Sequence, residues 1–241
     1  MLEGLHISVV IPAYNEAGRI QPVVRQIPPF VDRIVVVDDG SSDDTAERVD
    51  QTGEPRTQVV RHRHNCGVGG AIVTGYRNAM EQGTDVVVVM AGDGQMDPAD
   101  LLSLLQPVVE GRSDYVKGNR FQWPGVRGVM PPLRFWGGLC LSYLTRWTSG
   151  YPHIMDSQCG YTAATAGILR RVAMDTVYPR YGYPNDLLAH LHSAGARVEQ
   201  VPVRPVYEGQ ASGLHPVKAI LPMTFVLGRS LILRWVRECT S

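Results

Sequence analysis

Lysine is nearly absent from this chain of 241 residues: it occurs only at Lys117 and Lys218, and arginine supplies the rest of the permanent positive charge. Acidic and basic residues are equal in number, so the formal net charge is zero. A neutral total gives no bulk attraction to nucleic acid or to an anionic membrane. The sequence therefore predicts that nucleic acid is not a partner.

Paired cysteines and long apolar runs are also missing. The four cysteines show none of the spacings of zinc or redox motifs, which is typical of reduced thiols in the cytosol. Residues 1–6 lack the features of a signal peptide. The longest apolar stretch, 219–236, is interrupted by Arg229 and Arg234 and falls short of a membrane span. We therefore expect a cytoplasmic protein, with peripheral contact to the cytoplasmic membrane face as the alternative.

The chain does have a regular alternation of short apolar runs with helical patterns. The apolar runs are continuous, as in parallel strands that are buried on both faces. Strands are predicted at residues 7–11, 33–38, 58–61, 85–90 and 114–119. Helices are predicted at residues 16–27, 44–51, 68–82 and 98–110. Repeated β-α-β units imply a parallel sheet flanked by helices, so the predicted fold class is α/β.

After residue 120 the pattern loosens. Residues 121–130 are predicted to be a loop. Further strands are predicted at 157–164 and 197–203, and helices at 133–148, 185–194 and after Pro216. We see no internal repeat or linker, and predict one domain over residues 1–212. Residues 213–241 are predicted to form an apolar C-terminal helix that packs on the domain or lies at a membrane interface.

Polar residues and glycines gather where the predicted strands end. In parallel α/β sheets, ligands bind beyond the carboxyl ends of the strands. Four segments lie there: 12–16, 38–45, 65–71 and 92–95. The sequence thus predicts a ligand site at an acidic, glycine-rich rim of the sheet.

Asp93 is the residue of this rim best suited to hold a divalent cation. It stands between two glycines, which let a phosphate approach, and Gln95 offers a second oxygen ligand. A departing nucleoside diphosphate needs its growing negative charge neutralised, and hard cations take carboxylate, phosphate and water oxygens. An ordinary Asp-Gly turn is the structural alternative. For Asp38 and Asp39 we predict ligand contact: one accepts hydrogen bonds from a base or ribose, while the other faces the metal side or caps the turn.

Other binding motifs are less well supported. Residues 67–70 match part of a dinucleotide fingerprint, but Ile72 occupies its third glycine position, and no P-loop is present. Histidines form H-x-H pairs at 62–64 and 190–192, yet no third ligand is apparent, so no zinc site is predicted.

Four motifs together carry a resemblance to a known family. They are V-I-P-A-Y-N-E at 10–16, V-V-D-D-G-S-S-D-D-T at 36–45, N-C-G-V-G-G-A at 65–71 and G-D-G-Q at 92–95. The set resembles family 2 of the inverting glycosyltransferases, and within it the polyprenyl-phosphate sugar transferases such as the dolichyl-phosphate mannose synthases. The resemblance implies a GT-A fold, a nucleotide-sugar half over residues 1–120 and an acceptor half over residues 121–212.

The resemblance also implies Mg²⁺ or Mn²⁺ at Asp93 and Gln95. The family often has D-x-D here, and Ala91 replaces the first acid, so metal ligation depends on Asp93, Gln95, phosphates and water. The residues predicted to bind the nucleotide are Pro12, Tyr14, Glu16, Asp38, Asp39, Asn65, Gly67, Gly70 and Asp93.

Arg120 and Arg134 match arginines that the related enzymes use near the acceptor phosphate, and Asp186 stands where many relatives place an acid near the reacting centre. The structural alternatives are a surface charge for Arg134 and a helix N-terminal acid for Asp186. A lipid phosphate arrives ionised and needs only positioning by arginines. A hydroxyl acceptor needs a base, either Asp186 or Asp156.

The two arginines favour transfer of a hexose from GDP-mannose or a UDP-hexose to a polyprenyl phosphate. Transfer to a hydroxyl is the first alternative, and a non-catalytic subunit that binds sugar nucleotides is the second. A nucleotidyltransferase would have a glycine- and arginine-rich loop after the first strand, which residues 12–16 do not supply. Residues 221–235 are predicted to lie on a bilayer surface or to form a core or dimer helix.

Overall fold

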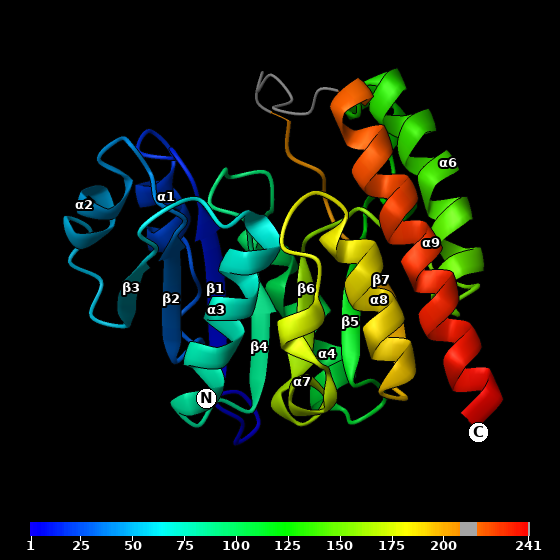
Figure 1. The fold of residues 1–241 in the computed structure, drawn as a ribbon. Coiled ribbons are helices and arrows are strands. Elements are labelled where there is room, and N and C mark those ends of the chain that lie inside the picture. The colour runs from blue at the N-terminus through cyan, green and yellow to red at the C-terminus, as the bar shows by residue number, and fades with distance from the viewer. Residues whose placement is uncertain (208–215, 241) are drawn as a thin grey trace.

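The computed structural model describes residues 1–207 and 216–240, with the side chains of 222–232, 234 and 235 in the last helix (Figure 1). The predicted domain boundary between residues 212 and 213 lies outside the described residues. None of the helices in the described ranges combines the length and hydropathy of a membrane span.

A seven-stranded sheet forms the centre of the molecule, with the strand order β3-β2-β1-β4-β6-β5-β7. Every neighbouring pair is parallel except those that involve β6, so the predicted mostly parallel sheet is confirmed. The strands are β1 (Ile7–Ala13), β2 (Arg33–Asp38), β3 (Thr57–Arg61), β4 (Val86–Val89), β5 (Tyr115–Asn119), β6 (Thr162–Thr165) and β7 (Val198–Pro202).

The strand β6 differs from the prediction of a strand over 157–164. It begins at Thr162 and runs antiparallel to both β4 and β5. The residues before it leave the ladder because side chains hold their amides: Asp156 accepts from the amide of Cys159 over 3.1 Å, and Ser142 accepts from the amide of Ser157 over 3.0 Å. These hydrogen bonds satisfy the backbone locally in place of a strand partner.

Helices cover both faces of the sheet (Figure 1). One apolar core contains residues of α1, α2 and α4, and the other contains residues of α3, α7 and α8. The helices are α1 (Ile20–Arg25), α2 (Thr45–Asp50), α3 (Val68–Glu81), α4 (Leu101–Val109), α5 (Val126–Val129), α6 (Pro132–Ser149), α7 (Ala166–Arg171), α8 (Tyr183–Ser193) and α9 (Pro216–Thr240), with 3-10 turns η1 (Pro98–Asp100), η2 (Arg120–Gln122) and η3 (Met174–Thr176).

Three differences from the sequence prediction concern helices. The first helix begins at Ile20 rather than at residue 16, because the preceding residues turn to approach the end of β2. The short α5 lies inside the predicted 121–130 loop, and α7 was not predicted. Both are brief, which leaves little periodicity to detect.

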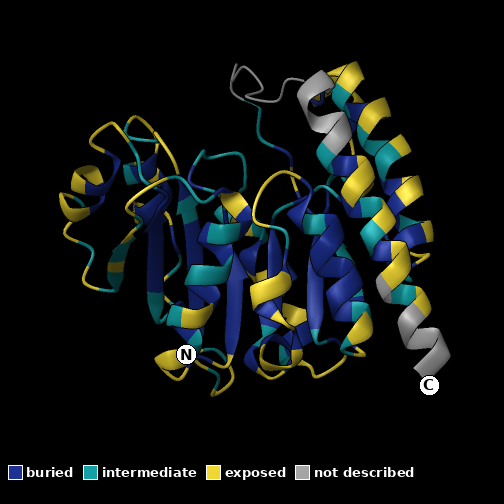
Figure 2. Cartoon of the chain, in the orientation of Figure 1, coloured by how far each residue is buried: buried dark blue, intermediate teal, exposed yellow. Residues whose placement is uncertain are grey.

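The pair α6 and α9 lies side by side at one end of the sheet (Figure 1). One side of α9 packs on α8 through Met223, Val226 and Ser230, which are buried. Figure 2 shows exposed residues along the outer side of both helices, whereas the sheet is buried throughout its centre. The two helices therefore present a surface unlike the rest of the molecule.

Candidate active site

The loops that follow β1 and β2 are joined by hydrogen bonds. Asn15 has a positive φ of 56°, its amide donates to Ser41 Oγ over 3.0 Å, and its side-chain oxygen accepts from the amide of Ser42 over 2.8 Å. The amide of Asp39 donates to the carbonyl of Ala13 over 2.8 Å. Tyr14, at the tip of the first loop, is exposed. The strand ends thus form one ordered rim.

The two aspartates after β2 are both buried. Asp38 accepts from the amide of Ser41 over 3.0 Å. Asp39 accepts from the amides of Cys66 and Gly67, each over 2.8 Å. Asp39 therefore orders the loop before α3, and its predicted contact with a nucleotide stays a prediction.

The glycine-rich segment before α3 packs against the chain itself. A Cβ on Gly67 would lie 2.6 Å from the carbonyl oxygen of Pro179, and the amide of Gly70 donates to that carbonyl over 3.0 Å. Asn65 accepts weakly from Arg180 through its side-chain oxygen and its carbonyl. Close packing explains the glycines locally, so the predicted nucleotide contacts of Asn65, Gly67 and Gly70 also stay predictions.

A pocket opens beside the end of β4, and three predicted residues line it: Asp93, Gln95 and Arg120. The amide of Gln95 donates to Asp93 Oδ1 over 3.0 Å, and Gly94 adopts the positive φ of 75° that this turn requires. Asp93 also borders a second pocket beside Arg19. The side chain of Asp93 is thus placed where two adjoining pockets meet.

Negative charge is concentrated near Asp93. Burial raises the pKa of Glu16, and the charges of Asp93 and Asp43 raise it further, while Arg19 opposes them from 3.1 Å. Pro12, beside Asp93 in the fold, accepts from the amide of Gly92 over 3.2 Å. The oxygens of Asp93 and Gln95 are of the type that Mg²⁺ and Mn²⁺ bind, together with phosphate and water oxygens.

Arg120 also lines this pocket, and it forms an ion pair with the fully buried Asp156. Its Nε and Nη2 lie 2.8 and 2.9 Å from the two carboxylate oxygens. Burial alone would raise the pKa of Asp156, but the charges of Arg120 and Lys117 hold it below the usual value. The ion pair with Asp156 uses one edge of the Arg120 guanidinium and fixes its orientation. The guanidinium has five N–H donors, so those on the other edge can still bind an anion.

Arg134 lies near the same pocket. Its guanidinium stacks 5.3 Å from the ring centroid of Tyr207, and Tyr207 lines the pocket with Arg120. Burial raises the pKa of Tyr181, and the charges of Arg134 and Arg120 both oppose that rise. Arg134 is therefore more than an isolated surface charge.

Asp186 lies elsewhere. It is fully buried, it accepts from the amide of Tyr178 over 2.7 Å, and it is 3.6 Å from Arg229 and 3.5 Å from His190. It is absent from the described walls of the Asp93 pocket. The geometry favours the structural alternative, an acid in the first turn of α8, and its role as a base stays a prediction.

Sequence reasoning missed several pocket residues. Lys117 is buried behind Arg120 and donates to the carbonyl of Cys159; burial lowers its pKa to about 8. The missed wall residues Arg204 and Tyr207 follow β7 and belong to no motif of the sequence. The rarity of lysine was the one signal that pointed to Lys117.

Comparison with known proteins supports the architecture. Residues 8–177 match the family described as Glycosyl transferase family 2. A UDP-N-acetylglucosamine–dolichyl-phosphate N-acetylglucosaminyltransferase from Methanococcus voltae is 32% identical over 216 residues, which cover 83% of this chain and 86% of the relative. An undecaprenyl-phosphate mannosyltransferase from Micrococcus luteus is 29% identical over 240 residues, covering 91% and 93% of the two chains.

A similar fold is found in glucosyl-3-phosphoglycerate synthase from Mycobacterium tuberculosis, solved with Mn²⁺, uridine diphosphate and phosphoglyceric acid. The TM-score is 0.70 at 23% identity, and the match covers 96% of this chain and 78% of that one. At this identity the likeness concerns the fold alone, and the predicted GT-A fold is confirmed.

Proposed function

The chain belongs to glycosyl transferase family 2 and is a hexosyltransferase, and from this premise we propose that it moves a hexose, with inversion, from a nucleoside-diphosphate sugar to a polyprenyl phosphate. The observation that carries the proposal is a single pocket whose lining contains Asp93, Gln95 and Arg120. An acid that can bind a cation with the donor and an arginine that can bind the phosphate of the acceptor therefore line the same pocket.

Asp93 and Gln95 would hold a divalent cation together with the donor diphosphate. The cation, when bound, neutralises the charge that develops on the leaving diphosphate. The residues of this chain position the donor: Asp38 and Asp39 lie at the end of β2, and Tyr14 and Glu16 lie at the end of β1. Support for the cation comes from the place of Asp93 and Gln95 in one pocket and from the negative charge of Asp93, which raises the pKa of Glu16.

Arg120 and Arg134 would position the acceptor phosphate. Paired N–H donors match phosphate oxygens, and alignment opposite the leaving group is the main catalytic requirement for an ionised nucleophile. No base is needed, which agrees with the burial of Asp186. Both relatives reported above are named for lipid-phosphate substrates, dolichyl and undecaprenyl phosphate. The enzyme of similar fold was solved with phosphoglyceric acid, which is not a lipid. Transfer to a hydroxyl of a soluble acceptor therefore remains the alternative.

The outer side of α6 fits the surface of a bilayer. Leu133, Trp136, Tyr143 and Trp147 are between 66% and 76% exposed and recur at spacings of three, seven and four residues along one helical face. Tryptophan and tyrosine favour the membrane interface because their rings are apolar and carry a polar atom. Arg134 lies at the pocket end of this helix, so a lipid entering from the bilayer would bring its phosphate to Arg134 and Arg120.

The proposal is tested by measuring hexose transfer from UDP- and GDP-sugars to polyprenyl phosphate, to polyprenol and to phosphoglycerate, with Mn²⁺ or Mg²⁺. We expect product only with the phosphate-bearing lipid. For Arg134→Ala we expect the KM for the lipid phosphate to rise about tenfold, the loss of one charge-assisted contact. Arg146→Ala is the matched control, because Arg146 also lies on α6 and stacks on a tyrosine, at 5.8 Å from Tyr143.

Two results would contradict the proposal. Equal losses in Arg134→Ala and Arg146→Ala would show that Arg134 acts only through the helix surface. Preferred transfer to a hydroxyl, with a loss of at least about 100-fold in kcat for folded Asp186→Asn, would establish base catalysis. The membrane contact is tested separately by liposome flotation, which should weaken in the double variant Trp136→Ser, Trp147→Ser.

A further inference from the structure

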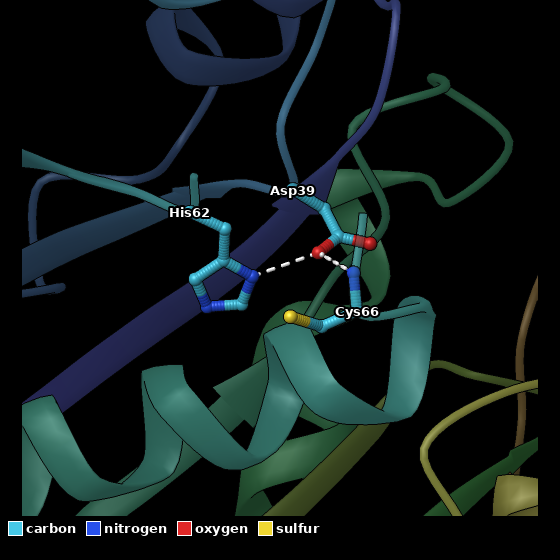
Figure 3. Close-up of side chains that lie close together, drawn as sticks. All are labelled: Asp39, His62 and Cys66. Atoms are coloured by element: carbon cyan, nitrogen blue, oxygen red, sulfur yellow. Dashed lines mark hydrogen bonds and ion pairs between the residues drawn. The ribbon is translucent and has the colours of Figure 1, made fainter. Parts of the chain in front are cut away.

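Three side chains of different chemistry meet at the rim: a carboxylate, an imidazole and a thiol (Figure 3). Asp39 follows β2, His62 follows β3 and Cys66 precedes α3. Their ligand atoms all lie within 4.8 Å of one another. The H-x-H pair at 62–64 does not itself supply this group, because His64 lies outside it; the fold instead brings Asp39, after β2, next to His62 and Cys66 in the loop between β3 and α3.

The surroundings already orient this group. His62 Nδ1 lies 2.7 Å from Asp39 Oδ1, and Nε2 lies 3.0 Å from Thr74 Oγ1 on α3. The amides of Cys66 and Gly67 fix the Asp39 carboxylate from the other side. A hydrogen bond on the outer ring nitrogen is the contact that typically sets the orientation of a metal-binding histidine.

We propose that Asp39, His62 and Cys66 form a binding site for a divalent cation of the zinc class. Thiolate and imidazole are preferred ligands of Zn²⁺, and three protein ligands leave a fourth position for water. Tetrahedral Zn²⁺ would hold Oδ1 and Nδ1 about 3.3 Å apart, so they need to separate by roughly half an ångström from the 2.7 Å observed. Mg²⁺ prefers oxygen ligands, so it would select the Asp93 region instead.

Binding of the cation moves two protons. The Cys66 thiol releases its proton to solvent, because the thiolate is the ligand. In the tautomer that donates from Nδ1 to Asp39, the imidazole proton moves to Nε2, where Thr74 Oγ1 accepts it. The His62–Asp39 hydrogen bond is thus replaced by two coordinate bonds, and the contact with Thr74 is kept.

One consequence rests on the proposed function. Asp39 is predicted to bind the base or ribose of the donor, and the same carboxylate would be a ligand of Zn²⁺. The cation and the donor would therefore compete for Asp39. Micromolar Zn²⁺ should raise the apparent Kd of the donor even when Mn²⁺ is in excess.

Absorption of Co²⁺ tests the site without any assay of activity, because a thiolate ligand gives a charge-transfer band in the near ultraviolet. We expect the full chain to bind one Co²⁺ with this band, and one equivalent of Zn²⁺ to remove it. Cys66→Ser should abolish the band. Cys140→Ser is the matched control, since Cys140 is an exposed cysteine on α6, and it should keep the band.

The remaining variants separate the ligands from the fold. His62→Gln should weaken Co²⁺ binding at least about tenfold, whereas His64→Gln should not, because His64 is exposed and outside the group. A wild-type protein without the thiolate band, or a band retained in Cys66→Ser, would overturn the proposal. Asp93→Ala should keep the band while losing Mn²⁺-dependent donor binding, so failure of this site and failure of the proposed function are distinguishable.

Discussion

Polar groups are held in place differently in the two halves of the sheet. In the half formed by β3, β2, β1 and β4, loops at the strand ends hydrogen-bond to one another, as between Asn15 and Ser42. In the half formed by β6, β5 and β7, a buried ion pair between Arg120 and Asp156 fixes the pocket wall. The first half depends on backbone shape, and the second depends on balanced charge.

The largest effect is expected from the substitution of Asp93, which should remove transfer activity while leaving the fold intact. We expect Asp93→Ala to lower kcat/KM at least about 100-fold, more than the loss of an outer-shell metal contact. Transfer assays at varied donor concentration measure kcat/KM, and calorimetric titration with donor and Mn²⁺ measures the accompanying loss of donor binding. Asp50→Ala is the control, because Asp50 is an exposed partner of Arg61. Donor binding within threefold of wild type in Asp93→Ala would contradict the assignment.

Asp156→Asn tests the charge balance of the other half. It leaves the Arg120 guanidinium without its anionic partner, and we expect the free energy of unfolding to fall by about 3 kcal/mol. Asp114→Asn is the matched control: Asp114 also pairs through two oxygens with an arginine, but Arg197 is mostly exposed, so about 1 kcal/mol or less is expected. Equal losses in urea unfolding would show that burial of the pair is unimportant.

Gly75→Ala tests the backbone packing of the first half. A Cβ at Gly75 on α3 would lie 2.2 Å from Val10 Cγ1 on β1, and such overpacking costs about 1–3 kcal/mol. Gly137→Ala is its opposite, because Gly137 lies within α6 with nothing near its Cβ position; alanine there should stabilise by up to about 1 kcal/mol. Thermal unfolding of both variants gives the comparison, which fails if the two shifts share a sign.

Lys117→Met tests a buried charge of the second half through the dependence of stability on pH. The pKa of Lys117 is about 8 in the folded protein and about 10.4 when unfolded. Between these values the unfolded chain binds more protons, so the free energy of unfolding of the wild type gains up to about 1.4 kcal/mol per pH unit. Urea unfolding from pH 7 to 9.5 should show this gain only in the wild type. A parallel pH dependence in the variant would exclude Lys117 as its source.

The two halves also differ in how much of their structure could be predicted from the sequence. Continuous valine runs and glycine-rich strand ends are local signals, so β1 to β5 and the position of Asp93 followed from them. The antiparallel β6 did not, because its direction is set by pairing with β4 and β5, and Thr-Ala-Ala-Thr carries no sign of it.

The site residues follow the same division. Arg120 could be matched at the end of a strand, but its partner Asp156 is 36 residues away, and burial of Asp186 depends on α9 packing over α8. The group of Asp39, His62 and Cys66 also joins two loops, because Asp39 follows β2 and the other two residues lie between β3 and α3. Long-range contacts of this kind leave no spacing that a motif could capture.

The place of β6 between β4 and β5 has a consequence for the order of folding. The four parallel strands can assemble from neighbouring β-α-β units, but β5 cannot join them until a strand more than 40 residues later in the chain has arrived between. Such non-local pairing slows folding. We therefore expect the half formed by β3, β2, β1 and β4 to acquire protected backbone amides early in refolding, and the pocket that Asp93 and Arg120 line to form only in the last step.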